Sequence, residues 1–241
     1  MLNSLRARAA AAGVLALCGV AVLAGLAREL LALGAAYPVT ATIVLAVVVV
    51  EMTVRINERN HPFLEFGLAN VVTLARATFV ALVTAAIGER AEPAIAAVAA
   101  AAAIAVTLMD GVDGWLARRT GMSTAFGARF DMEVDALLIQ ALSILVWTHD
   151  KAGAWVVMSG LLRYVFVAAG WVWPWMERPL EPSRRRQTVC VVQIVALITA
   201  LEPFVIRPYS TIIAAGALAA LVGSFFVDTR WLALHRRKQM A

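Results

Sequence analysis

The hydrophobic positions of this chain form long continuous runs, separated by short clusters of charged residues, glycine and proline. Runs of about 20 apolar residues predict membrane-spanning α-helices. An outer-membrane β-barrel would instead alternate with a period of two residues. The runs and their polar boundaries predict eight spans, near residues 9–27, 38–54, 69–88, 93–116, 126–148, 153–175, 187–204 and 209–227.

The composition indicates the same class of protein. Hydrophobic residues make up 62% of the 241 residues, charged residues only 15%, and the mean hydropathy is +0.81. Soluble domains carry about 25% charged residues. We therefore expect an all-α integral membrane protein. The first run exceeds a usual signal-peptide core and is expected to be a retained helix. The small residues of 96–106 predict a helix packed closely within the bundle. Cys18 and Cys190 lack metal-ligand spacing and are interpreted as small buried residues.

The net charge of +5 is explained by where the basic residues fall between the spans. With the N-terminus in the cytoplasm, basic residues gather on that side, as the positive-inside rule requires. We expect both termini to face the cytoplasm, in the inner membrane of a bacterium. No basic-aromatic motif suggests nucleic-acid binding. The opposite side receives only Arg28, Arg90, Lys151 and Arg207, whereas the cytoplasmic side receives Arg6, Arg8, Arg55, Arg59, Arg118, Arg119, Arg178, Arg184, Arg185, Arg186, Arg230, Arg236, Arg237 and Lys238.

Four aspartates stand between two of the most apolar runs. Asp110 and Asp113 are spaced i,i+3, and Asp131 and Asp135 are spaced i,i+4, so each pair shares one helix face. The intervening segment 120–124 predicts a helix break followed by an N-cap at Ser123 or Thr124. An antiparallel hairpin would bring the pairs together near the cytoplasmic boundary. Such close carboxylates need cations, and their oxygens suit two Mg²⁺ or Mn²⁺ ions.

Small residues and an arginine accompany these acids. Gly114 and Gly127 lie on the faces that carry the aspartates, and Ala117 extends this small surface. Arg118 offers a fork of donors suited to phosphate. Metal ions beside an arginine indicate phosphoryl chemistry on a pyrophosphate. A structural ion site or the polar pathway of a metal transporter is the alternative that these residues leave open.

Other polar residues carry weaker hypotheses. Arg163 lies inside a predicted span and must face a polar partner, either an anionic acceptor substrate or an acid elsewhere in the bundle. Residues 184–186 (Arg184, Arg185 and Arg186) could bind the same acceptor or serve only topology. Glu133 is expected on another helix face, without a metal role. Segment 55–67 is either an amphipathic piece in the headgroup region or a polar connector, and the Trp-rich segment 171–179 predicts an interfacial aromatic belt.

These residues together resemble a known family. The pattern Asp-x2-Asp-Gly-x2-Ala-Arg-x8-Gly-x3-Asp-x3-Asp is the signature of the CDP-alcohol phosphotransferases. The chain is similar to this family also at 69–76 (ANVVTLAR), where Ala69 replaces the usual proline, and more weakly at 182–189. The resemblance implies a six-helix catalytic core at 69–228, a two-helix N-terminal extension at 1–68 and a basic tail at 229–241. The signature positions are Asp110, Asp113, Gly114, Ala117, Arg118, Gly127, Asp131 and Asp135, and the 69–76 match rests on Asn70, Thr73 and Arg76.

The resemblance implies roles for these residues. The four aspartates would bind two divalent ions, and Asp135 would also act as the base that activates an acceptor hydroxyl. The cytidine and pyrophosphate would be held by Asn70, Thr73, Gly114, Ala117, Arg118 and Gly127. We expect a phospholipid synthase that transfers the phosphatidyl group of CDP-diacylglycerol to a small polar alcohol and releases CMP. A soluble CDP-alcohol donor with a lipid acceptor such as diacylglycerol is the alternative. Family resemblance also leads us to expect a homodimer.

Overall fold

The computed structural model describes residues 2–178, 180 and 183–235. Within them the chain forms eight α-helices and three short 3₁₀-helices, and no strand, which confirms the all-α prediction. Parts of the predicted segments, namely Pro179, Pro182 and residues 236–241 of the basic tail, lie outside the described residues. The helices are α1 (Leu2–Leu31), α2 (Ala36–Arg55), α3 (Leu68–Ala85), η1 (Ala86–Gly88), α4 (Pro93–Thr120), α5 (Ala125–Thr148), η2 (Ala154–Val157), α6 (Met158–Val172), η3 (Pro174–Glu177), α7 (Arg184–Leu201) and α8 (Tyr209–His235).

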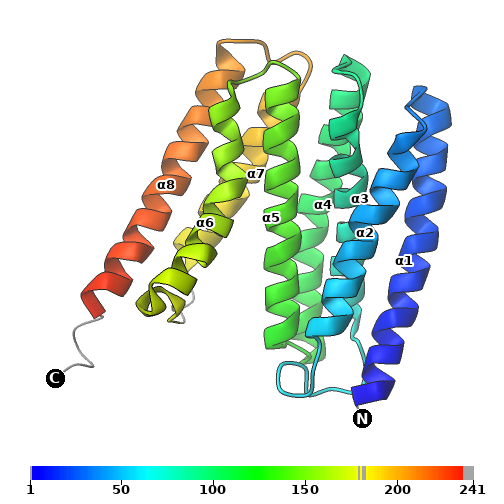
Figure 1. The fold of residues 1–241 in the computed structure, drawn as a ribbon, viewed down its shortest axis with the longest axis vertical. Coiled ribbons are helices and arrows are strands. Elements are labelled where there is room, and N and C mark those ends of the chain that lie inside the picture. Colours follow the sequence, from blue (N-terminus) through cyan, green and yellow to red (C-terminus); the bar gives the residue numbers. More distant parts are fainter. Residues whose placement is uncertain (1, 179, 181–182, 236–241) are drawn as a thin grey trace.

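The α-helices run alternately up and down, so that consecutive helices are antiparallel (Figure 1). The N-terminus, the connector 56–67, the turn between α4 and α5 and the C-terminal end of α8 all lie at the same end of the bundle (Figure 1). Since the predicted chemistry falls on that turn, we call this the site end.

Six helices are long and apolar enough to cross a membrane, by length and composition, among the described residues: Ser4–Leu31, Ala36–Arg55, Leu68–Gly88, Pro93–Thr120, Ala154–Val172 and Tyr209–Leu234. The chain is therefore an integral membrane protein. The other two predicted spans are the helices α5 and α7. Their sequences carry the acids of 131–135 and the arginines of 184–186, and these charged residues make the two helices less apolar than the other six.

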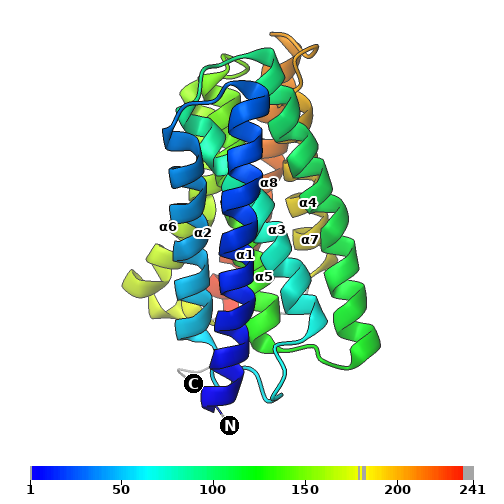
Figure 2. The ribbon, with the colours of Figure 1, turned by 90° about the vertical axis from the view of Figure 1, so that its right-hand side faces the viewer.

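Helices α1 and α2 form an outer pair that covers the rest of the bundle on one side (Figure 2). They approach each other closely at Gly13, where an added Cβ would lie 2.5 Å from Val49 Cγ1. Because α1 lies at the edge of the bundle, part of its surface faces away from the protein. Cys18 is exposed there, so the prediction that it is buried is wrong, whereas Cys190 on α7 is half-buried.

Helix α4 packs closely against α3 through its small residues. Ala96, Ala99, Ala100 and Ala103 are all buried, which confirms the tight packing predicted for 96–106. Small side chains allow helix backbones to approach closely within lipid. This packing holds α3 beside the C-terminal half of α4, where two of the aspartates lie.

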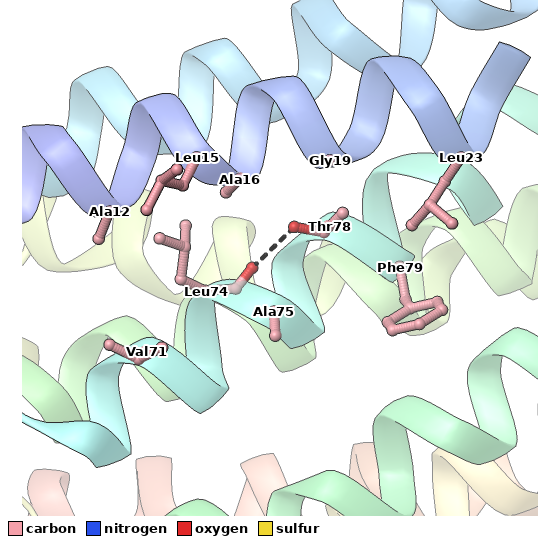
Figure 3. A pocket seen from close by; sticks show the side chains of 10 residues that line it. All are labelled: Ala12, Leu15, Ala16, Gly19, Leu23, Val71, Leu74, Ala75, Thr78 and Phe79. Atoms are coloured by element: carbon pink, nitrogen blue, oxygen red, sulfur yellow. Dashed lines mark hydrogen bonds between the residues drawn. The ribbon is translucent and has the colours of Figure 1, made fainter.

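A groove of about 390 Å³ lies between α1 and α3 (Figure 3). Alanine, leucine and valine side chains line most of it, with Gly19 and Phe79. Its one hydroxyl, on Thr78, donates to the carbonyl oxygen of Leu74 at 3.1 Å and is satisfied within its own helix (Figure 3). A surface without ionisable groups is part of the apolar exterior and cannot hold phosphate.

Opposite the site end, Lys151 ties α5 to the loop between α7 and α8. Its Nζ donates to the carbonyl oxygens of Glu202 at 2.8 Å, Pro203 at 3.3 Å and Val205 at 2.8 Å. The Ser210 hydroxyl in turn donates to the Lys151 carbonyl oxygen at 2.6 Å. One side chain therefore contacts three carbonyl groups of the turn that follows α7, where regular helix hydrogen bonding has ended.

Candidate active site

The turn between α4 and α5 is built as its sequence predicted. Helix α4 ends at Gly121, whose φ of +67° is the left-handed conformation that glycine adopts without strain. Helix α5 is N-capped by Thr124, whose hydroxyl accepts from the Gly127 backbone N–H at 2.9 Å. The Phe126 N–H donates to the carbonyl oxygen of Asn60 at 3.1 Å. The connector 56–67 therefore also satisfies a donor at the start of α5.

The four aspartates meet around Arg76, a residue to which neither its spacing nor the family resemblance assigns a role. The guanidinium of Arg76, on α3, is fully buried. Its Nη1 lies 2.7 Å from Asp113 Oδ2 and hydrogen-bonds Asp131 Oδ1. Its Nη2 lies 2.8 Å from Asp110 Oδ1 and 2.6 Å from Asp135 Oδ1. Arg76 thus joins both helices of the hairpin to α3.

One sequence signal could have identified Arg76. An arginine inside an otherwise apolar span must face a polar partner. Arg76 follows Asn70 and Thr73 at intervals of three residues, which forms a polar stripe along α3. The sequence could not show which residues are the partners of this stripe, because they are distant in the chain. Asp135, for example, lies 59 residues from Arg76.

The aspartate cluster fits a divalent cation. Asp110, Asp113 and Asp131 each offer a carboxylate oxygen within 4.8 Å of the others. Oxygen-only donor sets suit Mg²⁺ and Mn²⁺. The charges of the cluster favour the same conclusion, because the single cation Arg76 leaves three of the four carboxylate charges unbalanced. Asp135 stands outside this three-residue group.

Asn70 on α3 is buried and has a fixed orientation. Its amide Nδ2 donates to the Phe66 carbonyl oxygen at 2.5 Å and lies 3.2 Å from His61 Nε2. The other ring nitrogen of His61 lies 3.2 Å from the Phe63 carbonyl oxygen, so Nδ1 donates and Nε2 accepts. The Asn70 carbonyl oxygen is then directed at Gly127, where an added Cβ would approach it to 2.9 Å.

The remaining predicted nucleotide residues lie around the same hairpin. The Thr73 hydroxyl is buried, 3.0 Å from Asp113 Oδ2 and 3.1 Å from the Ala69 carbonyl oxygen. Arg118 is exposed and folds back over its own helix, so that a Cβ on Gly114 would lie 3.2 Å from its Nη1. Ala117 is half-buried beside it. The small residues therefore give the Arg118 guanidinium room against the backbone of α4.

Arg163 forms an ion pair with Glu133, at 2.7 Å between Nη2 and Oε1. Glu133 lies midway between Asp131 and Asp135 in sequence and therefore on the opposite face of α5. This is the structural pairing that the sequence left open for Arg163. It also gives Glu133 a partner away from the aspartate cluster.

The arginines of 184–186 lie at the beginning of α7, at the site end (Figure 1). Arg185 Nη2 lies 2.5 Å from Asp228 Oδ1 and its Nη1 donates to the Ser224 carbonyl oxygen at 2.7 Å. Arg186 Nη1 lies 3.3 Å from the same Asp228 oxygen. These contacts hold the start of α7 against α8. Further along α7, the Cys190 thiol lies 3.9 Å from Asp135 Oδ2, so α7 forms one wall of the site.

Fold and site together define a helix-bundle membrane protein with an acid-lined site at one end. The chain belongs to the CDP-alcohol phosphatidyltransferase family, whose model matches residues 66–224. The chain is also similar to a CDP-diacylglycerol–glycerol-3-phosphate 3-phosphatidyltransferase of Bacillus subtilis (strain 168), with 32% identity over 109 residues. This match covers 41% of the present chain and 56% of the relative. No solved structure matches the chain significantly.

The family and the relative are both named for the transfer of a phosphatidyl group. All eight positions of the signature hairpin fall inside the matched range. The outer pair α1 and α2 precedes it, as does the first part of the connector 56–67.

Proposed function

We propose that the protein transfers the phosphatidyl group of CDP-diacylglycerol to a small phosphorylated alcohol, glycerol 3-phosphate, and releases CMP. The observation that carries this proposal is the convergence of four signature aspartates at one end of a membrane bundle. The named activity of the Bacillus subtilis relative supports the choice of donor and acceptor.

The site residues divide into two groups in this proposal. Asp110, Asp113 and Asp131 hold the divalent ions, which when bound neutralise charge on the donor pyrophosphate and on the leaving CMP. The small surface at Gly114, Ala117 and Gly127, with Arg118 and Asn70, receives the cytidine and its phosphates. Thr73 supports this group indirectly, since its hydroxyl lies against Asp113.

Asp135 takes the proton in the reaction that we propose. The acceptor hydroxyl gives its proton to the Asp135 carboxylate, and its oxygen forms a bond to the donor phosphorus that carries diacylglycerol. The bond from that phosphorus to the bridging oxygen breaks, and CMP leaves with that oxygen. The Asp135 Oδ2 atom faces the α7 wall at Cys190, away from Arg76 on Oδ1. This supports an approach of the acceptor from the side of α7.

The acceptor phosphate would then meet the arginines at the start of α7. Arg186 precedes Cys190 by four residues, so both lie on one face of α7, one turn apart. Arg184 and Arg185 add positive charge at the same end. Arg163, paired with Glu133 on the other face of α5, lies less directly in this path.

We propose that the site end faces the cytoplasm of a bacterial cell. The basic residues that the sequence assigns to the cytoplasmic side flank the helix ends there, as the positive-inside rule requires. CDP-linked donors and phosphorylated alcohols are charged and do not cross lipid, so the site must open to the compartment that contains them. A homodimer remains part of the proposal through the family alone.

The test is an acceptor screen with purified protein, CDP-diacylglycerol and Mg²⁺ or Mn²⁺. We expect CMP release and a phosphatidyl product, identified by mass, with glycerol 3-phosphate but not with serine or free inositol. The Asp135→Asn variant should lose about 10²–10⁴-fold in rate, the usual contribution of a general base. CMP release only from a soluble CDP-alcohol with diacylglycerol would establish the alternative, in which the donor is soluble and the acceptor is the lipid. Metal uptake into vesicles without any CMP release would identify a transporter instead.

A further inference from the structure

The Arg76 guanidinium lies among the carboxylates that a divalent cation would use. Its two terminal nitrogens contact one oxygen of each of the four aspartates, at 2.6–2.8 Å for Asp110, Asp113 and Asp135. Divalent ions bind carboxylate oxygens at about 2.0–2.6 Å. A metal ion and this guanidinium therefore cannot use the same oxygens in the same arrangement.

The charges strengthen this conflict. Arg76 stays positively charged under all ordinary conditions and is fully buried, so water screens its repulsion of another cation only weakly. The same charge is what allows four carboxylates to stay together before a metal binds. Arg76 must therefore favour the metal-free cluster and oppose the loading of the metal.

The guanidinium is also incompletely satisfied where it lies. Among the described residues its Nε–H is buried without a hydrogen-bond partner. A buried donor without a partner costs free energy. Arg76 is thus held in place by its contacts with the four carboxylates rather than by full pairing of its guanidinium.

We propose that Arg76 is the resident counter-ion of the aspartate cluster and competes with divalent cations for it. Arg76 holds the four carboxylates together in the metal-free protein, and it sets the metal concentration at which the site fills. To admit a metal ion, Arg76 would have to release carboxylate oxygens of the cluster. This inference rests on the metal site of the proposed function, but it concerns the affinity of that site rather than the reaction.

The experiment measures Mn²⁺ binding without nucleotide, by calorimetry and by the spin-resonance signal of free Mn²⁺. It compares wild type with Arg76→Gln and Arg76→Lys, all purified with Mn²⁺ and then stripped by a chelator. Arg207→Gln is the matched control, since it also removes one positive charge but lies beyond the far end of α7, next to the exposed Asp150. Melting temperatures are recorded in chelator and in saturating Mn²⁺.

We expect Arg76→Gln to bind Mn²⁺ at least tenfold more tightly than wild type and to melt earlier in chelator, so that Mn²⁺ stabilises it more. Arg76→Lys should tighten binding less, because a compact ammonium keeps the charge but cannot span four carboxylates. Arg76→Lys also keeps the inference testable if Arg76→Gln does not fold. Equal or weaker Mn²⁺ binding by the Arg76 variants, with wild type binding normally, would overturn the inference alone. Absence of Mn²⁺ binding by wild type and by both Arg76 variants would instead contradict the proposed metal site.

Discussion

Gly127→Ala offers the sharpest test of how the hairpin receives a nucleotide. The added Cβ would lie 2.9 Å from the Asn70 carbonyl oxygen and 3.1 Å from the Thr124 hydroxyl, whereas ordinary contacts begin at 3.4 Å. Asn70 would have to retreat by about half an ångström. Its hydrogen bonds to the Phe66 carbonyl oxygen and to His61 oppose that movement.

The energetic consequence has two parts. Overpacking of this kind costs about 1–3 kcal/mol, and replacing glycine by alanine within a helix returns about 1 kcal/mol. The net loss of stability should then stay below about 2 kcal/mol, and the protein should fold. The displaced Asn70 carbonyl oxygen could then no longer accept a hydrogen bond from the CDP-linked donor substrate. One hydrogen bond of roughly 1.5 kcal/mol corresponds to about a tenfold rise in KM for the CDP-linked donor.

The assay is CMP release as a function of donor concentration, with melting temperature measured in the same detergent. Gly111→Ala is the matched control in the same hairpin, because its Cβ would meet nothing within 4 Å. It should keep the wild-type KM and melt at the same temperature or later. An unchanged KM in Gly127→Ala would refute the assignment of this surface to the nucleotide.

Three further variants test other parts of the structure. Thr124→Ala removes the N-cap of α5 and should cost about 0.5–2 kcal/mol, seen as faster hydrogen exchange at the start of α5; unchanged exchange would contradict the cap. Gly160→Ala places a Cβ 2.6 Å from the Gln140 Cα atom, so it should lower the melting temperature by an overpacking cost of about 1–3 kcal/mol. Gly216→Ala is the control: its Cβ would meet nothing within 4 Å, so its melting temperature should not fall. Lys151→Met removes the three carbonyl contacts far from the site and should lower the melting temperature through a loss of about 1–3 kcal/mol, whereas a changed Mn²⁺ affinity would show that the two ends are coupled.

Local features of this chain were predictable because they depend on residues close in sequence. The apolar runs gave the helices, and Gly121 and Thr124 gave the break and the cap of the hairpin. The i,i+3 and i,i+4 spacings placed each aspartate pair on one helix face. Within the part of the chain that the structure describes, six of the predicted spans meet the length and composition of a membrane helix.

Contacts between segments that are distant in the chain could not be predicted from the sequence. Arg76 was matched to the family motif, but its place among the four aspartates depends on how α3 packs against α4 and α5. The choice between two partners for Arg163 likewise depended on the rotation of α6 toward Glu133. The error at Cys18 has a related cause, since an apolar helix at the edge of a membrane bundle carries no polar face to reveal which side meets lipid.

The contacts of the connector 56–67 bear on where a minimal catalytic unit of this protein would begin. The family match starts at Phe66, and a chain cut there would retain every aspartate and Arg76. It would lose Asn60, whose carbonyl oxygen receives the Phe126 N–H, and His61, which orients Asn70. The boundary of shared sequence is therefore not a boundary of structural independence. Compared with the full chain, the truncated protein should keep most of its metal affinity but bind the nucleotide more weakly.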